Sequence, residues 1–432
     1  MQDTLERKLK ASEKAFYKWK KTSFKERQKL LASLSKLLLK NKVELATLIT
    51  KEMNKPISQS ISEIEKCAAM CKYYAEIKNP LSIEKITTEM EISEVRPEPM
   101  GVILGVMPWN YPFWQVLRFA VPAVLAGNTV VVKHASICLK SGQRIQKLFQ
   151  EAGFKKQVFS HWKVSHKEVE AMIKHPIIKG VSLTGSESAG RAIAKTAGEQ
   201  LKKCVLELGG SDPFIVLDDA DLKLAAKDAA QARLQNCGQT CVAAKRFIIH
   251  EKVYEKFVTL LVKEYSLFEP RDPMDRNTQL SKMAREDLAN ELEKQYEKAI
   301  ANGAKILTPL KKKGKMGFKP GLIQVKSSNP ILEEELFGPL GMILKAKNDA
   351  SALAMANDSP FGLAGAVYSK SKKRTQFFSD GLEVGSVAIN QVFRSDFRMP
   401  FGGRKNSGYG VELSKYALEE FSVKKSVVGH LK

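Results

Sequence analysis

Between residues 100 and 210, short runs rich in β-branched residues alternate with segments of helical pattern. The runs are VILGVM (102–107), TVVVK (129–133), GVSLT (180–184) and CVLELGG (204–210), and helices are expected from about Phe113, Cys138 and Ala189. This alternation is typical of a parallel sheet whose strands are joined by crossover helices. A second α/β region is expected over residues 211–410. Ligands of such sheets bind beyond the carboxyl ends of the strands, so residues that follow each strand are the first candidates for a site.

The part of the chain before this region is predicted to be helical. Residues 23–54 show leucines at helical spacing, and Ser23 with Glu26 forms a capping box at the start. A second helix is expected from Pro56 to about Lys78. Residues 81–99 alternate like a strand between two prolines, which indicates a hairpin arm outside the core.

The charge balance excludes some classes of partner and favours others. The 432 residues include 70 Lys plus Arg against 47 Asp plus Glu, a formal net charge of +23. The lysines are spread along the chain without interleaved aromatic residues, so we expect a solvated basic surface and no nucleic-acid partner. Such a surface favours anionic small molecules.

Targeting signals, membrane spans and metal motifs are not expected. The N-terminal sequence MQDTLERKLK is charged, and the longest apolar run is interrupted by Pro122 and Gly127, so we expect a soluble, cytoplasmic protein with no membrane partner. Six cysteines in a chain of this length do not make a disulfide scaffold. The six histidines match no zinc spacing, so no metal is expected.

Four residues near the strand ends, or in the loops beyond them, have side chains suited to catalysis. Asn110 could donate a hydrogen bond to an oxyanion, or simply cap its loop. Lys133 could reach a ribose or a phosphate, or be a solvated lysine. Glu207 lies among apolar residues, where a raised pKa would suit a general base, although a salt bridge is the commoner role. Cys241 has small neighbours, as a nucleophile requires, although most cysteines are buried and inert.

The segment QNCGQTCVAAKRF (235–247) holds a second cysteine, Cys237, four residues before Cys241. Cys237 is interpreted as a small buried residue of the same turn. The alternative is a reversible disulfide with Cys241 under oxidation, which needs Cα atoms within about 7 Å of each other.

Eight motifs together resemble the aldehyde dehydrogenase superfamily over residues 5 to 430. In order, they are PWNYP, GNTVVVK, LTGSESAG, LELGGSDPFIV, NCGQTC, EEELFGP, NDSPFGLAG and PFGGRKNSGYG. Within the superfamily the sequence is most similar to bacterial succinate-semialdehyde dehydrogenases. The resemblance implies an α/β fold with a Rossmann-type cofactor domain, an α/β catalytic domain and a β-hairpin oligomerisation arm. It implies these domain bounds: 1–79 and 100–209 for the NAD(P)-binding domain, 210–412 for the catalytic domain, and 80–99 with 413–432 for the arm.

The resemblance also implies catalytic roles. Cys241 matches the nucleophile that attacks the aldehyde, and Asn110 matches the oxyanion donor. Glu207 matches the base that activates water to hydrolyse the thioester, which favours a free carboxylate as product.

The cofactor implied by the resemblance is NADP or NAD. Ser136 stands where many NAD-selective relatives carry a Glu, so a lean toward NADP is expected. The cofactor-binding residues implied are Met107, Trp109, Lys133, Ser136, Gly185, Ser186, Glu335 and Phe337.

For the substrate, Arg118 and Ser395 match the positions that bind the carboxylate of succinate semialdehyde. Gln235 stands where some relatives carry a further Arg, so another semialdehyde or a simple aliphatic aldehyde stays open as an alternative. A non-catalytic binding protein on this fold is a more distant alternative. The arm implies a homodimer or a tetramer.

Overall fold

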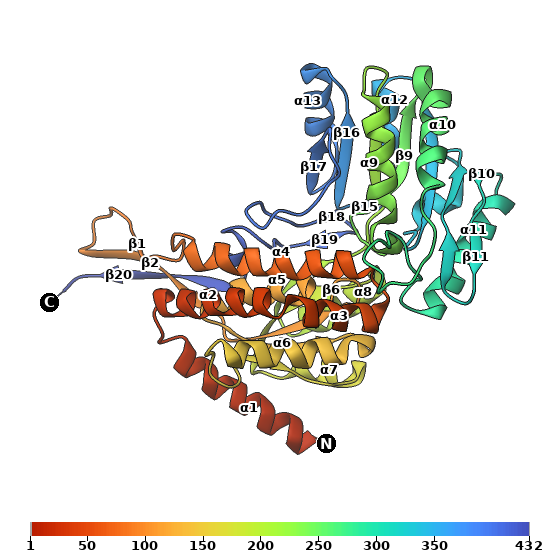
Figure 1. Ribbon diagram of the computed structural model, residues 1–432. Coiled ribbons are helices and arrows are strands. Elements are labelled where there is room, and N and C mark those ends of the chain that lie inside the picture. The colour runs from red at the N-terminus through yellow and green to blue at the C-terminus, as the bar shows by residue number, and fades with distance from the viewer. Residues whose placement is uncertain (1, 432) are drawn as a thin grey trace.

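The computed structural model describes residues 2–431, which form two large sheets, a three-stranded sheet that projects from the body and two two-stranded sheets (Figure 1). The six-stranded sheet has the order β19-β7-β6-β3-β4-β5, and its neighbouring strands are parallel except for β19 against β7. Its strands are β3 (Val102–Met107), β4 (Thr129–His134), β5 (Phe159–His161), β6 (Ile178–Thr184), β7 (Lys203–Glu207) and β19 (Gly408–Tyr409). The predicted parallel α/β arrangement is therefore confirmed.

Helices cover this sheet, which explains why its central strands are continuous apolar runs. The crossover helices are α5 (Trp114–Leu125), α6 (Leu139–Glu151), α7 (His166–Lys174) and α8 (Glu187–Glu199). The N-terminal helices are α1 (Gln2–Trp19), α2 (Phe24–Lys40), α3 (Lys42–Met53) and α4 (Ile57–Glu76). Among residues 2–431, no helix has both the length and the apolar character that crossing a membrane requires.

The seven-stranded sheet has the order β10-β13-β14-β9-β8-β16-β17 and is parallel from β13 to β17. Its strands are β8 (Asp212–Val216), β9 (Ala244–His250), β10 (Lys305–Thr308), β13 (Gly321–Gln324), β14 (Leu340–Ala346), β16 (Ala364–Tyr368) and β17 (Ser386–Ile389). Its helices are α9 (Leu222–Leu234), α10 (Tyr254–Tyr265), α11 (Glu286–Ala301), α12 (Asp349–Asn357) and α13 (Lys372–Gly381). Smaller elements are β11 (Lys311–Lys313), β12 (Gly317–Lys319), β15 (Phe361–Gly362), β18 (Arg404–Lys405) and α14 (Ala417–Glu420).

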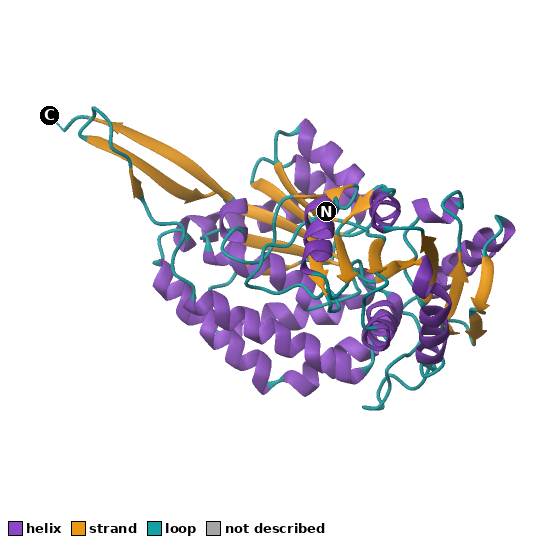
Figure 2. Ribbon diagram, turned by 90° about the horizontal axis from the view of Figure 1, so that it is seen from above, coloured by secondary structure: helices purple, strands orange, loops and turns teal. Residues whose placement is uncertain are grey.

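The third sheet is an arm that extends away from the body (Figure 2). The predicted hairpin is present as β1 (Glu84–Lys85) and β2 (Ile92–Pro99). The arm's third strand, β20 (Ser422–Gly429), pairs antiparallel with the whole length of β2. Chain segments from both ends of the sequence thus share this sheet.

The helix predicted over residues 23–54 is wrong in one respect. The capping box is confirmed, because Ser23 N donates to Glu26 Oε2 at 2.7 Å and Glu26 N donates to Ser23 Oγ at 3.2 Å. The chain leaves the helical conformation at Asn41, however, which ends α2 and precedes α3. The Asn41 amide donates to the carbonyl of Leu37 at 2.8 Å, and this side chain–backbone bond competes with helix continuation.

The pairing of β19 with β7 depends on Gly408, which lies opposite Glu207 with a φ of +111°. A Cβ at this position would lie 2.0 Å from the Leu206 carbonyl oxygen. We expect Gly408→Ala to lower the free energy of unfolding by about 3 kcal/mol, because it combines a strained φ with a backbone clash. Chemical denaturation measures this effect.

The matched control is Gly198→Ala on the exposed face of α8, where a Cβ would meet no atom within 4 Å. It should raise stability by about 0.5 to 1 kcal/mol, since alanine favours a helix. Equal denaturation midpoints for the two variants would contradict the proposed strain at Gly408.

Candidate active site

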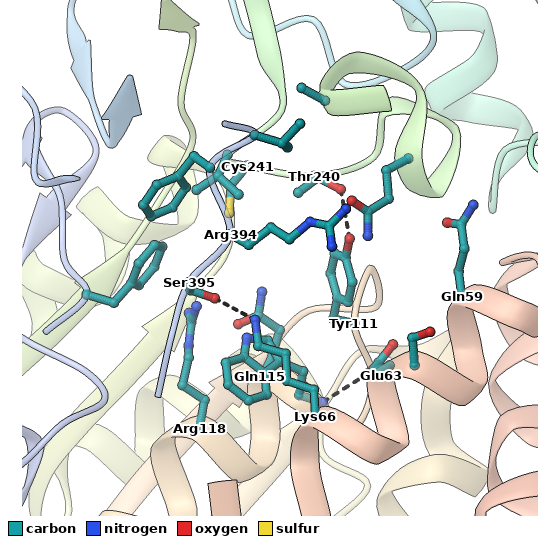
Figure 3. A pocket seen from close by; sticks show the side chains of 18 residues that line it. Gln59, Glu63, Lys66, Tyr111, Gln115, Arg118, Thr240, Cys241, Arg394 and Ser395 are labelled. Atoms are coloured by element: carbon teal, nitrogen blue, oxygen red, sulfur yellow. Dashed lines mark hydrogen bonds between the residues drawn. The ribbon is translucent and has the colours of Figure 1, made fainter. Parts of the chain in front are cut away.

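Cys241 lies on a wall shared by two cavities. It follows the short 3-10 turn Gln235–Gly238 and precedes β9. One cavity, of about 260 Å³, lies on the side of α4 and α5, and Figure 3 shows the Cys241 sulfur pointing into it. The other, of about 220 Å³, lies at the carboxyl ends of β3 and β6 and at the start of α8. A nucleophile in this position can meet one ligand from each side.

The loop before Cys241 is held in an unusual backbone conformation. Asn236, Cys237 and Gly238 have φ values of 52°, 56° and 72°. The Asn236 amide donates to the carbonyl of Asn110 at 2.9 Å, which ties the cysteine loop to the loop after β3. Such φ values persist only where surrounding contacts enforce them, and they are common at functional sites.

Lys245 is a site residue that the sequence patterns did not reveal. Its buried ammonium donates to the carbonyls of Thr240 at 3.0 Å and Cys241 at 2.6 Å, and it lies 3.3 Å from Glu335 Oε1. The available signal was a lysine four residues after the candidate nucleophile, at the start of a strand whose every residue is buried. Lys245 fixes the position of the Cys241 backbone from β9.

Burial controls the protonation of Cys241. Desolvation raises the pKa of its thiol to about 12, against the opposing charges of Arg118 and Lys245. The reactive thiolate is therefore a minor species at neutral pH unless a ligand changes these surroundings.

Asn110 is placed beside the nucleophile as expected. It is buried, lines the 220 Å³ cavity together with Cys241, and donates from Nδ2 to the carbonyl of Gln239 at 3.1 Å. The amide carries a second N–H on the same nitrogen. An oxyanion formed at Cys241 can therefore be reached by an amide donor.

Glu207 ends β7 and is 2% exposed. Neither of its carboxylate oxygens has a hydrogen-bond partner among residues 2–431. Burial raises the pKa of Glu207 well above its usual range; Arg118 lowers it and Glu412 raises it further. A carboxyl group in this state becomes a base only after it loses a proton in the site.

Arg118 lies in the wall of the 260 Å³ cavity, but its charge is balanced within the protein. Its guanidinium forms a buried ion pair with Glu412 and lies 4.8 Å from the centroid of the Phe401 ring. The sequence patterns did not anticipate Glu412, because no local pattern connects it with Arg118. Ser395 lines the same cavity, as does Gln235.

Five of the eight predicted cofactor residues share the 220 Å³ cavity with the oxyanion candidate Asn110: Trp109, Gly185, Ser186, Glu335 and Phe337. Ser186 is the N-cap of α8, whose first N–H groups suit a pyrophosphate. Met107, Lys133 and Ser136 are not in its walls; they lie at or just beyond the ends of the paired strands β3 and β4. The N-terminus of α8, Lys133 and Ser136 thus follow one another along the strand ends, and this arrangement suits the binding of an extended dinucleotide.

Cys237 lines neither of these cavities. Its sulfur is buried and lies 3.4 Å from Ser281 Oγ, and it accepts from the Ser281 amide at the same distance. These contacts fit a packing role, and the disulfide with Cys241 stays a prediction.

A cysteine between two cavities, one of them at strand ends and a helix N-terminus, is the arrangement expected of a nucleotide-dependent enzyme with a thiol nucleophile. The model of the aldehyde dehydrogenase family matches residues 1–427, and the chain belongs to that family.

The similar proteins include enzymes named for one substrate. The NADP+ succinate-semialdehyde dehydrogenase of Deinococcus radiodurans is 39% identical, over 97% of this chain and 89% of that protein. The NAD(P)+ succinate semialdehyde dehydrogenase Sad of Escherichia coli is 42% identical, over 97% and 92%. The structure of succinic semialdehyde dehydrogenase from Streptococcus pyogenes with NADP+ is 34% identical, with a TM-score of 0.95 over 99% of this chain and 95% of that chain.

A substitution of Glu412 tests how neighbouring charges control the ionisation of Glu207. Glu412→Gln removes a negative charge and leaves Arg118 unbalanced, and both changes favour ionised Glu207. If Glu207 is the base, the acid limb of the pH profile for acyl-enzyme hydrolysis should move down by about one pH unit or more. Stopped-flow decay of an acylated Cys241 measures it.

The control for this shift is Glu419→Gln, which removes a carboxylate that contacts Lys424 on the surface. Its profile should match that of the unmodified protein. An acid limb that stays in place or moves upward in Glu412→Gln contradicts the proposed electrostatics.

Proposed function

We propose that the protein oxidises succinate semialdehyde to succinate with NADP or NAD. The observation that carries the proposal is the shared wall at Cys241, which lets an aldehyde and a nicotinamide approach the same sulfur from two cavities. The 260 Å³ cavity carries the cationic side chains of Lys66, Arg118 and Arg394, which favour an aldehyde with a carboxylate at its other end.

The proposed reaction begins with the Cys241 thiolate. It attacks the aldehyde carbon, and the oxyanion that forms accepts hydrogen bonds from the Asn110 amide and the Cys241 backbone N–H. The nicotinamide, when bound, supplies the acceptor for the hydride that leaves this carbon, so the carbon becomes a thioester of Cys241. Glu207 then takes a proton from water, the hydroxide attacks the thioester, and the acid and the thiol are released.

Cofactor selection is proposed to depend on the end of β4. Ser136 puts no carboxylate near the expected ribose, and Lys133 adds a positive charge that a 2′-phosphate would accept. Two similar proteins are named for NADP+ or NAD(P)+, which supports the lean toward NADP.

We also propose a cytoplasmic location for the protein. Its six cysteines are unpaired, which fits this proposal.

A steady-state screen tests the proposed function. Succinate semialdehyde, glutarate semialdehyde and butanal would each be measured with NADP and with NAD. We expect kcat/KM to be highest for succinate semialdehyde with NADP, by about tenfold or more over butanal, since a buried charge pair contributes at this scale.

Cys241→Ala is the control and should have no dehydrogenase activity with any combination of aldehyde and cofactor. A preference for butanal would favour the alternative of an aliphatic aldehyde, and higher kcat/KM with NAD would remove the lean toward NADP. Activity that persists in Cys241→Ala would contradict the mechanism.

We also propose that the arm makes the protein a homodimer or a tetramer. Val423, Val428, Ile83 and Ile86 on the arm are 44% to 68% exposed. A three-stranded sheet with exposed apolar residues and free edges is suited to pairing with a second copy.

Deletion of residues 422–432 removes β20 and tests this assembly. We expect the full chain to sediment as a dimer or tetramer at micromolar concentration and the deletion variant as a smaller species. A variant with Lys424→Ser and Lys425→Ser controls for loss of surface charge and should keep the assembly. A full chain that sediments as a monomer contradicts the proposal.

A further inference from the structure

The cavity beside Cys241 contains a lysine that the sequence patterns did not single out. Lys66 lies on α4, its side chain is half-buried, and its ammonium donates to Ser395 Oγ at 2.9 Å. The ammonium lies 4.1 Å from the centroid of the Trp114 ring. Figure 3 shows the Lys66–Ser395 hydrogen bond at the cavity that the Cys241 sulfur enters. The ring and the hydroxyl thus hold a positive charge at this wall.

The carboxylates around Lys66 are already paired with other cations. Among residues 2–431, no carboxylate oxygen lies within 4.0 Å of the Lys66 ammonium. The two carboxylates whose charges act on it are Glu63, which pairs with Lys55, and Asp396, which pairs with Arg398. The pocket therefore contains a partly desolvated ammonium without an anion of its own.

This arrangement is electrostatically costly in the absence of an anion. Burial and, to a smaller extent, the nearby charge of Arg118 lower the pKa of Lys66 to about 8, although the charges of Asp396 and Glu63 act in the opposite direction. A buried cation that lacks a partner destabilises its site, and an anion that enters the cavity would relieve this cost. The same anion would further favour the charged form of the lysine, which already predominates at neutral pH.

We propose that Lys66, acting with the Ser395 hydroxyl, binds the carboxylate of the substrate in this cavity. The inference rests on the proposed function and adds a specificity residue to it. Lys66 uses one of its three N–H groups on Ser395, and the Ser395 hydroxyl keeps its own proton to donate. Two donors from α4 and from the loop after β17 would therefore meet one carboxylate. The aldehyde end would then extend across the cavity to Cys241.

The other cations of the cavity are less suited to this role. Arg118 has Glu412 as an ion-pair partner inside the protein, so part of its charge is balanced before a substrate binds. Arg394 also lines the cavity, but its side chain is exposed, where water and salt screen its charge. Among these three cations, Lys66 is the one that is partly desolvated and has no carboxylate of residues 2–431 within 4.0 Å.

The test compares an aldehyde with a carboxylate and one without. Lys66→Met keeps an apolar stem against Trp114 and removes the charge. It should raise KM for succinate semialdehyde about 10- to 100-fold and leave KM for butanal within about twofold, with kcat little changed for either aldehyde. Retained turnover of butanal shows that the variant is folded. Lys72→Met, on the exposed face of the same helix, is the matched control and should change neither KM.

Two further variants keep the test decisive. Ser395→Ala should raise KM for succinate semialdehyde selectively but by a smaller factor, and it serves in place of Lys66→Met should that variant not fold. Arg394→Gln should raise KM for succinate semialdehyde less than Lys66→Met does, because Arg394 is exposed. Equal changes with both aldehydes, an unchanged KM for succinate semialdehyde, or a selective effect in Arg394→Gln alone would overturn the inference.

A second readout separates this inference from the proposed function. Succinate should protect Cys241 of the unmodified protein from alkylation by iodoacetamide, and Lys66→Met should lose this protection. If the unmodified protein shows no preference for succinate semialdehyde but succinate protects it through Lys66, the proposed function fails and the carboxylate site stands. If succinate protects both proteins equally, or neither, the role of Lys66 is refuted.

Discussion

The candidate active site depends on one buried ammonium, that of Lys245. It extends from a central strand of the seven-stranded sheet and holds the carbonyls of Thr240 and Cys241, while Glu335 supplies the compensating carboxylate. A buried charge is stable only with such partners, so the loop cannot move without leaving them unsatisfied. The Cys241 sulfur thereby acquires the rigidity of the strand, although the residue itself belongs to a loop. Both cavities beside Cys241 border this loop.

Desolvation then determines the protonation states of the groups that are proposed to react. It raises the pKa values of both Cys241 and Glu207, so the ligand-free site holds a thiol and a carboxylic acid and not the two charged forms that the chemistry requires. The positive charge of Arg118 lowers the pKa values of both Cys241 and Glu207. The ion pair with Glu412 reduces this effect of Arg118. The Arg118–Glu412 pair therefore acts mainly on the protonation of Glu207 and Cys241. Its closeness to the substrate cavity does not by itself make Arg118 the stronger anion site.

Local sequence patterns predicted the strands and the residues near their ends, because buried parallel strands need apolar β-branched runs whatever the rest of the chain does. They located Asn110 and Glu207 for that reason, whereas Cys241, which precedes β9, was located by its small neighbours and by the motif NCGQTC. The structure brings Asn110 and Cys241 to one cavity. Patterns failed where a single side chain ends a helix. The apolar residues of 23–54 keep helical spacing throughout, but the helix ends at Asn41. Patterns also failed for Glu412, since a contact between residues distant in sequence leaves no local periodicity.

Lys66 illustrates a further limit of sequence reasoning, in a chain with 70 lysines and arginines. On a helical wheel it resembles any solvated lysine, and composition assigns it to a general basic surface. Its difference lies in the environment, because each neighbouring carboxylate is committed to another cation while water is partly excluded. A net charge of +23 can attract anions to the protein. It does not make binding selective for one anion, because exposed charges are screened. Selection requires a cation whose desolvation cost is offset only by the correct anion, in the correct position relative to the reacting sulfur.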